Sequence, residues 1–68
     1  MKNNISNRIK ELRYEKGISQ AKLAKEIDVT QKAIDFWEKG INEPKASYIV
    51  ALAKFFGVSC DYLLGIED

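Results

Sequence analysis

The sequence contains no histidine, one cysteine and one proline among its 68 residues. Without histidine, the chain lacks the commonest general acid or base and the usual imidazole metal ligand. A single cysteine forms neither an internal disulfide nor a zinc knuckle, and Cys60 is interpreted as a small hydrophobic residue of a protein from a reducing cytoplasm. These absences argue against an enzyme, a bound metal and any other cofactor.

The sequence also lacks a long hydrophobic run. Its longest apolar stretches cover residues 48–53 and 55–58, counting Gly57, whereas a membrane-spanning helix needs about 20 apolar residues. The first ten residues, MKNNISNRIK, lack the apolar core of a signal peptide. We therefore expect one cytoplasmic domain over residues 1–68, with residues 66–68 as a tail, no membrane partner and no small-molecule ligand.

Hydrophobic residues recur at helical spacing in five short segments, and no segment alternates as a strand does. Serine or threonine precedes three of the segments as a helix N-cap, and glycine follows four of them as a stop. We therefore expect an all-α fold with helices over about residues 6–16, 20–28, 31–39, 44–56 and 60–64.

The second and third of these helices are separated by a very short turn around Asp28 and Val29. Aspartate is one of the few residues besides glycine that tolerate a left-handed backbone, so Asp28 can turn the chain sharply. Two short helices joined this tightly cross at a steep angle, which is the geometry of a helix-turn-helix.

Polar side chains gather where these two helices begin. Gln20 opens the second helix, and Thr30 precedes the third. Helix N-termini carry free amides and a partial positive charge, which favour phosphate. Glutamine matches the major-groove edge of adenine, and lysine matches that of guanine, so the pattern favours DNA as a partner. The stripe of the third helix left outside after its apolar face is buried consists of Gln31, Lys32, Asp35, Phe36 and Lys39.

The sequence resembles the Cro/repressor type of bacterial and phage helix-turn-helix transcription regulators. The resemblance runs from about residue 5 to 65 and rests on RIKELRYEKGISQAKLAKEIDVTQKAIDFWEKG, then NEP, then ALAKFFGVSCDYLLG. It implies a compact five-helix domain like that of lambda repressor, in which the second and third helices form the helix-turn-helix. Members of this family often continue into a sensor or oligomerisation domain. The chain therefore corresponds either to a complete small repressor or to an N-terminal domain.

The resemblance implies that Gln31, Lys32 and Phe36 face base edges. Phe36 stands where the family more often has a polar residue, and its ring is suited to a thymine methyl group. Packing of the ring against a neighbouring lysine, or a protein interface, are the alternatives for this residue. Asp35 places a carboxylate beside the groove, where it can accept from cytosine or penalise other bases.

The resemblance also implies contacts to the DNA backbone, from helix ends and from the loop after the third helix. Gln20 is further implied to buttress Gln31, and Arg13 to form an ion pair with Glu38 that joins the first helix to the third. The alternative for the polar residues is that they are ordinary solvated side chains. The phosphate-contacting set comprises Gln20, Thr30, Lys39, Asn42 and Lys45.

The fourth helix, ASYIVALAKFF, is apolar almost all round. This is more hydrophobic surface than the core of so small a domain readily absorbs, and exposed apolar surplus usually marks a partner surface. We therefore expect a homodimer. The residues expected at its interface are Tyr48, Ala51, Phe55 and Tyr62.

The near-neutral net charge of +1 conceals an uneven distribution. Residues 1–45 hold ten Lys and Arg against seven Asp and Glu, leaving +3, and residues 46–68 hold one against three, leaving −2. The positive part contains the expected helix-turn-helix. We therefore predict a sequence-specific DNA-binding transcription regulator, a repressor whose dimer binds a palindromic operator with the third helix in the major groove. An antitoxin-like or other protein-interaction module, acting through the fourth and fifth helices, stays open, and an enzyme is least supported.

Overall fold

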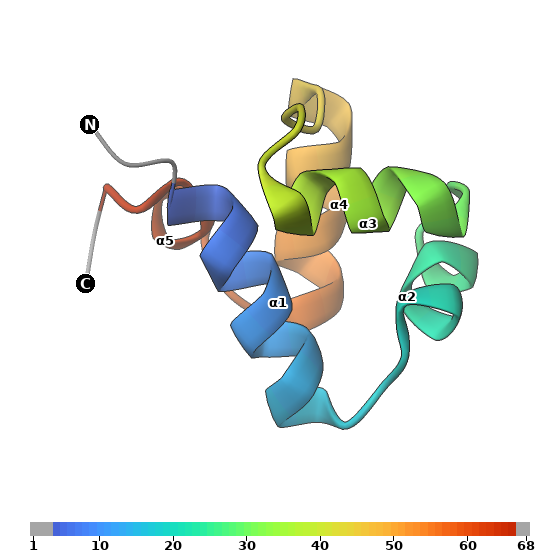
Figure 1. Ribbon diagram of the computed structural model, residues 1–68. Coiled ribbons are helices and arrows are strands. Elements are labelled where there is room, and N and C mark those ends of the chain that lie inside the picture. The colour runs from blue at the N-terminus through green and yellow to red at the C-terminus, as the bar shows by residue number, and fades with distance from the viewer. Residues whose placement is uncertain (1–3, 67–68) are drawn as a thin grey trace.

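The computed structural model describes residues 4–66, and in that range it contains five helices and no strand (Figure 1). The all-α prediction is therefore confirmed. The first helix begins two residues earlier than expected, the second ends two residues earlier, and the fourth begins two residues later. Of the expected tail, Ile66 is 70% exposed, and residues 67 and 68 lie outside the described range. The helices are α1 (Asn4–Lys16), α2 (Gln20–Glu26), α3 (Gln31–Lys39), α4 (Ala46–Phe56) and α5 (Cys60–Leu64).

Local sequence determines where most of these helices begin and end. The hydroxyls of Ser19, Thr30 and Ser59 each accept a hydrogen bond from the backbone amide three residues further on, at 3.0, 3.1 and 3.0 Å. Each hydroxyl thereby satisfies one of the amides that a helix N-terminus leaves without an internal partner. Asp28 has a φ of 62°, the left-handed conformation expected of it, and this early turn is why α2 ends before Asp28.

The core is made of one fully buried aliphatic side chain from each helix, with smaller and partly buried residues packed around them. Trp37 on α3 is also buried and belongs to the same cluster. Burial of side chains of this size stabilises a fold by about 1.5 to 3 kcal/mol each. All five helices therefore depend on one shared centre, whose fully buried members are Ile9, Leu23, Ile34, Leu52 and Leu63.

The arrangement places the α2–α3 corner and α5 on opposite sides of the molecule (Figure 1). α1 joins the two sides, because it packs against α3 and also against α5. α4 packs against α5 and passes behind α3 in the view of Figure 1. None of the helices in residues 4–66 combines the length and apolar character that crossing a membrane requires. The α2–α3 corner is therefore not covered by α5, and the rest of the domain packs behind it.

Candidate nucleic-acid interface

Backbone hydrogen bonds close the helix ends on both sides of the turn between α2 and α3. The amide of Val29 donates to the carbonyl of Ala24 at 2.9 Å, and the amide of Ile34 donates to the carbonyl of Thr30 at 3.4 Å. Leu23 and Ala24 are buried at the point where α2 meets α3. Because the turn is short and α2 packs against α3, the N-terminal ends of the two helices are held in fixed positions relative to each other.

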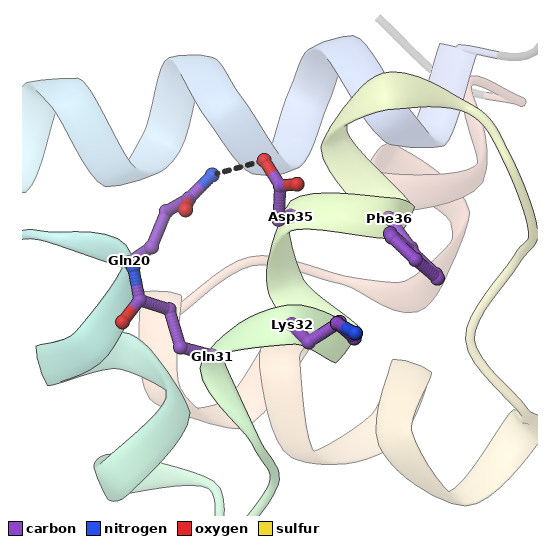
Figure 2. Close-up of a pocket in the computed structure, with 5 residues that line it drawn as sticks. All are labelled: Gln20, Gln31, Lys32, Asp35 and Phe36. Atoms are coloured by element: carbon purple, nitrogen blue, oxygen red, sulfur yellow. Dashed lines mark hydrogen bonds between the residues drawn. The ribbon is translucent and has the colours of Figure 1, made fainter.

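An open hollow of about 450 Å³ lies across this corner. Its lining combines two amides, a cation, a carboxylate and an aromatic ring, so it offers donors, acceptors and an apolar surface within one small area. Figure 2 shows these side chains projecting from the first residues of α2 and from one side of α3. The hollow brings together five residues predicted from the sequence to contact DNA: Gln20, Gln31, Lys32, Asp35 and Phe36.

A buried ion pair lies behind the hollow. Arg13 on α1 donates to Glu38 on α3 through two nitrogens, Nε to Oε2 at 2.6 Å and Nη2 to Oε1 at 2.9 Å. The side chains are only 9% and 2% exposed. Hydrogen bonding to Glu38 raises the pKa of the Arg13 guanidinium against the opposing effect of desolvation. The third guanidinium nitrogen of Arg13, Nη1, donates to the carbonyl of Ile18 at 3.0 Å. Arg13 therefore connects α1 to the loop before α2 and, through Glu38, to α3.

Gln20 connects this ion pair to the surface. Its amide nitrogen donates to Glu38 Oε1 at 3.1 Å. It also donates to Asp35 Oδ1 at 3.2 Å (Figure 2). The sequence resemblance implied that Gln20 buttresses Gln31, whereas the structure directs the Gln20 amide to two carboxylates of α3. The difference arises because Asp35 and Glu38 both face the start of α2. We call Arg13, Glu38, Gln20 and Asp35 the polar network.

The exposed end of the polar network reaches Lys39. The Lys39 ammonium lies 3.0 Å from Asp35 Oδ2 in an i,i+4 ion pair on the surface of α3. The hydrogen bond from Lys39, followed by the one from Gln20, lowers the pKa of the Asp35 carboxyl from its usual value. Asp35 is therefore an ionised acceptor at neutral pH, and Lys39 has a partner within the protein.

Lys32 and Phe36 lie together on the other side of the hollow. The Lys32 ammonium is 5.9 Å from the centre of the Phe36 ring, at the outer limit of a cation–π contact. This is the packing against a neighbouring lysine that the sequence left open for Phe36, and it leaves the half-buried ring on the lining of the hollow. Gln31 is exposed at the start of α3.

The residues predicted to contact phosphate are on the surface, at separate points around the hollow. Thr30 is exposed, with its hydroxyl engaged as the N-cap of α3. Asn42 and Lys45 are exposed in the segment between α3 and α4, and Lys45 is the N-cap residue of α4. Of this set, Gln20 lines the hollow and the others do not.

The four residues predicted at a dimer interface are partly buried. The Tyr48 ring packs on Trp37, with ring centres 5.6 Å apart. Cations from α1 cover the other two rings. Arg8 lies 4.0 Å from the centre of the Tyr62 ring, and the Lys16 ammonium lies 5.3 Å from that of Phe55. The expected aromatic surplus is therefore largely absorbed by the domain.

The apolar side chains that remain exposed on α4 and α5 are different ones. Val50 is 43% exposed and Leu64 is 41% exposed. Sequence periodicity did not single them out, because the fourth helix is apolar on nearly every face and its orientation is set by the other helices. Ala51, beside Val50, is of intermediate exposure.

The described part of the chain offers no metal centre. Across residues 4–66, no group of three or more His, Cys, Asp or Glu is placed to hold a metal ion. Cys60 is half-buried and packs against the core, as the sequence interpretation of a small hydrophobic residue requires.

Two capped helices joined by a tight left-handed turn, with a hollow of mixed polar and apolar lining across their exposed corner, define a helix-turn-helix domain. Comparison with known proteins agrees: the helix-turn-helix family matches residues 9–63, and the chain belongs to that family. The resemblance noted in the sequence is thereby confirmed.

Characterised relatives include both activators and repressors. The chain is 33% identical over 64 residues to the transcriptional activator BcrR of Enterococcus faecalis, and 38% identical over 60 residues to repressor protein C2 of Salmonella phage P22. These regions cover 94% and 88% of this chain but only 31% and 28% of those relatives. A crystal structure of the P22 c2 repressor in complex with a synthetic operator is similar over 97% of this chain and 100% of that one, at 35% identity and a TM-score of 0.89.

Proposed function

We propose that this chain is a DNA-binding domain of a transcription regulator, and that it inserts α3 into the major groove of double-stranded DNA. The observation that carries the proposal is the hollow at the α2–α3 corner, on a body that matches a repressor solved on its operator. An α-helix fits the major groove, and the lining side chains offer the donors, acceptor and apolar surface that base edges require.

The proposal assigns direct base contacts to three of the four α3 residues that line the hollow. Gln31 pairs with adenine N6 and N7, and Lys32 donates to guanine O6 or N7. The Phe36 ring, which lies beside Lys32, packs against a thymine methyl group. Because all three project from one side of the same helix, they meet neighbouring base pairs rather than a single one (Figure 2).

Contacts to the phosphates fix the position of α3 in the groove. Thr30 is at the N-terminus of α3, where the helix dipole favours negative charge. Asn42 and Lys45 are exposed in the segment that follows α3, from which the proposal has them contact the DNA backbone. Such contacts orient a protein on the duplex without reading its sequence.

The proposed regulator is a cytoplasmic repressor that acts as a dimer by occupying a palindromic operator. Two copies contact half-sites about 34 Å apart, one turn of the double helix. Exposed Val50, with Ala51 beside it, and exposed Leu64 support an interface on the α4 and α5 side, whereas the covered rings of Phe55 and Tyr62 contribute less than the sequence indicated.

Selection of bound duplexes from a random DNA pool tests the proposal. A selected sequence is expected to bind with a Kd well below that of a scrambled duplex. Gln31→Ala is expected to reduce this discrimination by about 1 to 3 kcal/mol, because one bidentate base contact is lost. Glu15→Gln on exposed α1 is the control and leaves the ratio unchanged. Equal weakening on both duplexes by Gln31→Ala would contradict its role in base selection, and no enrichment from the pool would contradict the proposed function.

A further inference from the structure

The Asp35 carboxylate has both of its oxygens occupied by the protein itself. Oδ1 accepts from the Gln20 amide at 3.2 Å, and Oδ2 is 3.0 Å from the Lys39 ammonium. The side chain is still 31% exposed and lines the hollow that faces the proposed partner (Figure 2). A carboxylate on the surface that approaches a polyanion is unfavourable, so its presence needs a reason beyond simple attraction to DNA.

We propose that Asp35 makes the phosphate contact of Lys39 conditional on the base pair opposite α3. The inference rests on the proposed DNA-binding function and adds a mechanism of sequence selection to it. Lys39 would otherwise contribute equally on every DNA sequence. With Asp35 as its partner, Lys39 contributes to binding only where a group in the groove can replace the Lys39 ammonium beside the Asp35 carboxylate.

The coupling follows from charge. When the Lys39 ammonium moves from Asp35 to a phosphate, it leaves an ionised carboxylate inside the groove without its cation. The exocyclic amino group of cytosine or adenine offers a donor that compensates this loss. Guanine O6 and thymine O4 offer acceptors instead, which repel the carboxylate. Lys39 therefore reaches its phosphate at little cost only when an amino group lies opposite Asp35.

The polar network keeps the Asp35 carboxylate facing the base pair when Lys39 moves to a phosphate. Gln20 donates to Asp35 and also to Glu38, and Glu38 is held in the interior by two hydrogen bonds from Arg13. The Gln20 amide is thus anchored from behind, and it holds the Asp35 carboxylate on the lining of the hollow. A free aspartate would rotate toward solvent and leave Lys39 independent of the base pair.

α2 carries a matched pair that lies outside the hollow. Lys22 and Glu26 form an i,i+4 ion pair with an N–O distance of 2.8 Å, and their side chains are 54% and 37% exposed. This pair is also a lysine and a carboxylate at i,i+4, in the reverse order along the helix, and neither residue lines the hollow. Glu26→Gln therefore releases a lysine on the same corner without removing a carboxylate from the base-facing surface.

The test measures the Kd of four proteins for two duplexes. The duplexes are one selected from a random pool and a scrambled version of it, and the proteins are the unmodified chain, Lys39→Ala, Asp35→Asn and the double variant. In the unmodified background, Lys39→Ala is expected to weaken binding about fivefold or more on the selected duplex, as for loss of one charged contact, and less than about twofold on the scrambled one. In the Asp35→Asn background, Lys39→Ala is expected to weaken binding to the selected and the scrambled duplex equally.

A second readout is the salt dependence of binding to the scrambled duplex. Asp35→Asn is expected to steepen the slope of log K against log salt by about 0.9, because Lys39 becomes available for one more phosphate. Glu26→Gln is expected to leave the effect of Lys39→Ala unchanged on both duplexes. Circular dichroism checks that each variant is folded.

The outcomes separate this inference from the function on which it rests. If the chain binds the selected duplex but Lys39→Ala weakens both duplexes equally in the unmodified background, Lys39 is an unconditional phosphate contact and the inference is wrong. The same holds if Asp35→Asn leaves the selective effect of Lys39→Ala intact. If no duplex is enriched or bound, the proposed function fails and the inference fails with it.

Discussion

The α2–α3 corner and the α1–α5 side of the molecule differ in the main partners of their charged residues. At the corner, charged groups bind one another through the polar network, in pairs with carboxylate partners. On the other side, the cations of Arg8 and Lys16 cover the aromatic rings of Tyr62 and Phe55. The comparison shows that nearly equal numbers of positive and negative charges do not make a uniform surface. At the α2–α3 corner, carboxylates position polar groups. On the α1–α5 side, cations cover aromatic rings.

The largest expected effect comes from breaking the polar network at its buried end. Glu38→Ala leaves the Arg13 guanidinium buried without its partner and removes an acceptor from Gln20. Loss of one member of a buried ion pair costs about 3 to 5 kcal/mol, so urea unfolding should show most of the stability of this small domain lost. The exposed variant Glu26→Gln is the control, with an expected loss below about 0.5 kcal/mol. A loss below about 1 kcal/mol for Glu38→Ala would show that solvent reaches the pair.

On the α1–α5 side, the free energy of unfolding is instead expected to depend on packing of apolar side chains. Leu63 is fully buried, whereas Leu64 beside it is 41% exposed, so the two leucines form a matched pair. Leu63→Ala is expected to lower the free energy of unfolding by about 3 kcal/mol through the cavity that it leaves, and Leu64→Ala by less than about 1 kcal/mol. Urea unfolding measures both. Similar losses for the two variants would contradict the placement of α5.

The contacts between cations and aromatic rings should contribute a smaller amount to the free energy of unfolding. Arg8→Ala removes the cation 4.0 Å from the Tyr62 ring and is expected to cost about 0.5 to 1 kcal/mol. Lys10→Ala, an exposed change on the same helix, is the control and should cost no more than a few tenths. Tyr62→Leu combined with Arg8→Ala completes a double-mutant cycle. A coupling energy of zero in that cycle would show that Arg8 and Tyr62 do not interact.

The smallest effect concerns acid stability at the corner. Lys39 and Gln20 lower the folded pKa of Asp35 below its ordinary value of 3.8, so the ionised carboxylate stabilises the fold at pH values above 3.8. That contribution is lost as the pH falls through the lower folded pKa. Thermal unfolding midpoints measured from neutral pH into the acid range should therefore fall less steeply for Asp35→Asn than for the unmodified chain. Parallel curves would show that Asp35 does not titrate with folding.

Features that depend on neighbours in the sequence could be predicted. The caps at Ser19, Thr30 and Ser59 and the left-handed turn at Asp28 involve residues within a few positions of one another, and the structure has all four. The five helices and their common core follow from the same local periodicity. The ion pair of Arg13 and Glu38, 25 residues apart, was implied by family resemblance and not by any pattern in the residues themselves.

Features that depend on how helices pack could not be predicted in the same way. The direction of the Gln20 amide is determined by two carboxylates 15 and 18 residues further along the chain. The exposure of Tyr62 depends on Arg8, from the other end of the sequence. Hydrophobic content alone therefore overestimated the apolar surface left for a partner, because the cations that cover it come from a different helix.

The shared core also determines how this domain comes apart. Because each helix inserts one fully buried aliphatic side chain into the same centre, no helix can detach without opening a cavity against the other four. Detachment of one helix therefore loses the packing of its buried side chain and exposes apolar surface in the shared core. The slowest-exchanging amides of the five helices are therefore expected to exchange their hydrogens through one common event, the global unfolding of the domain.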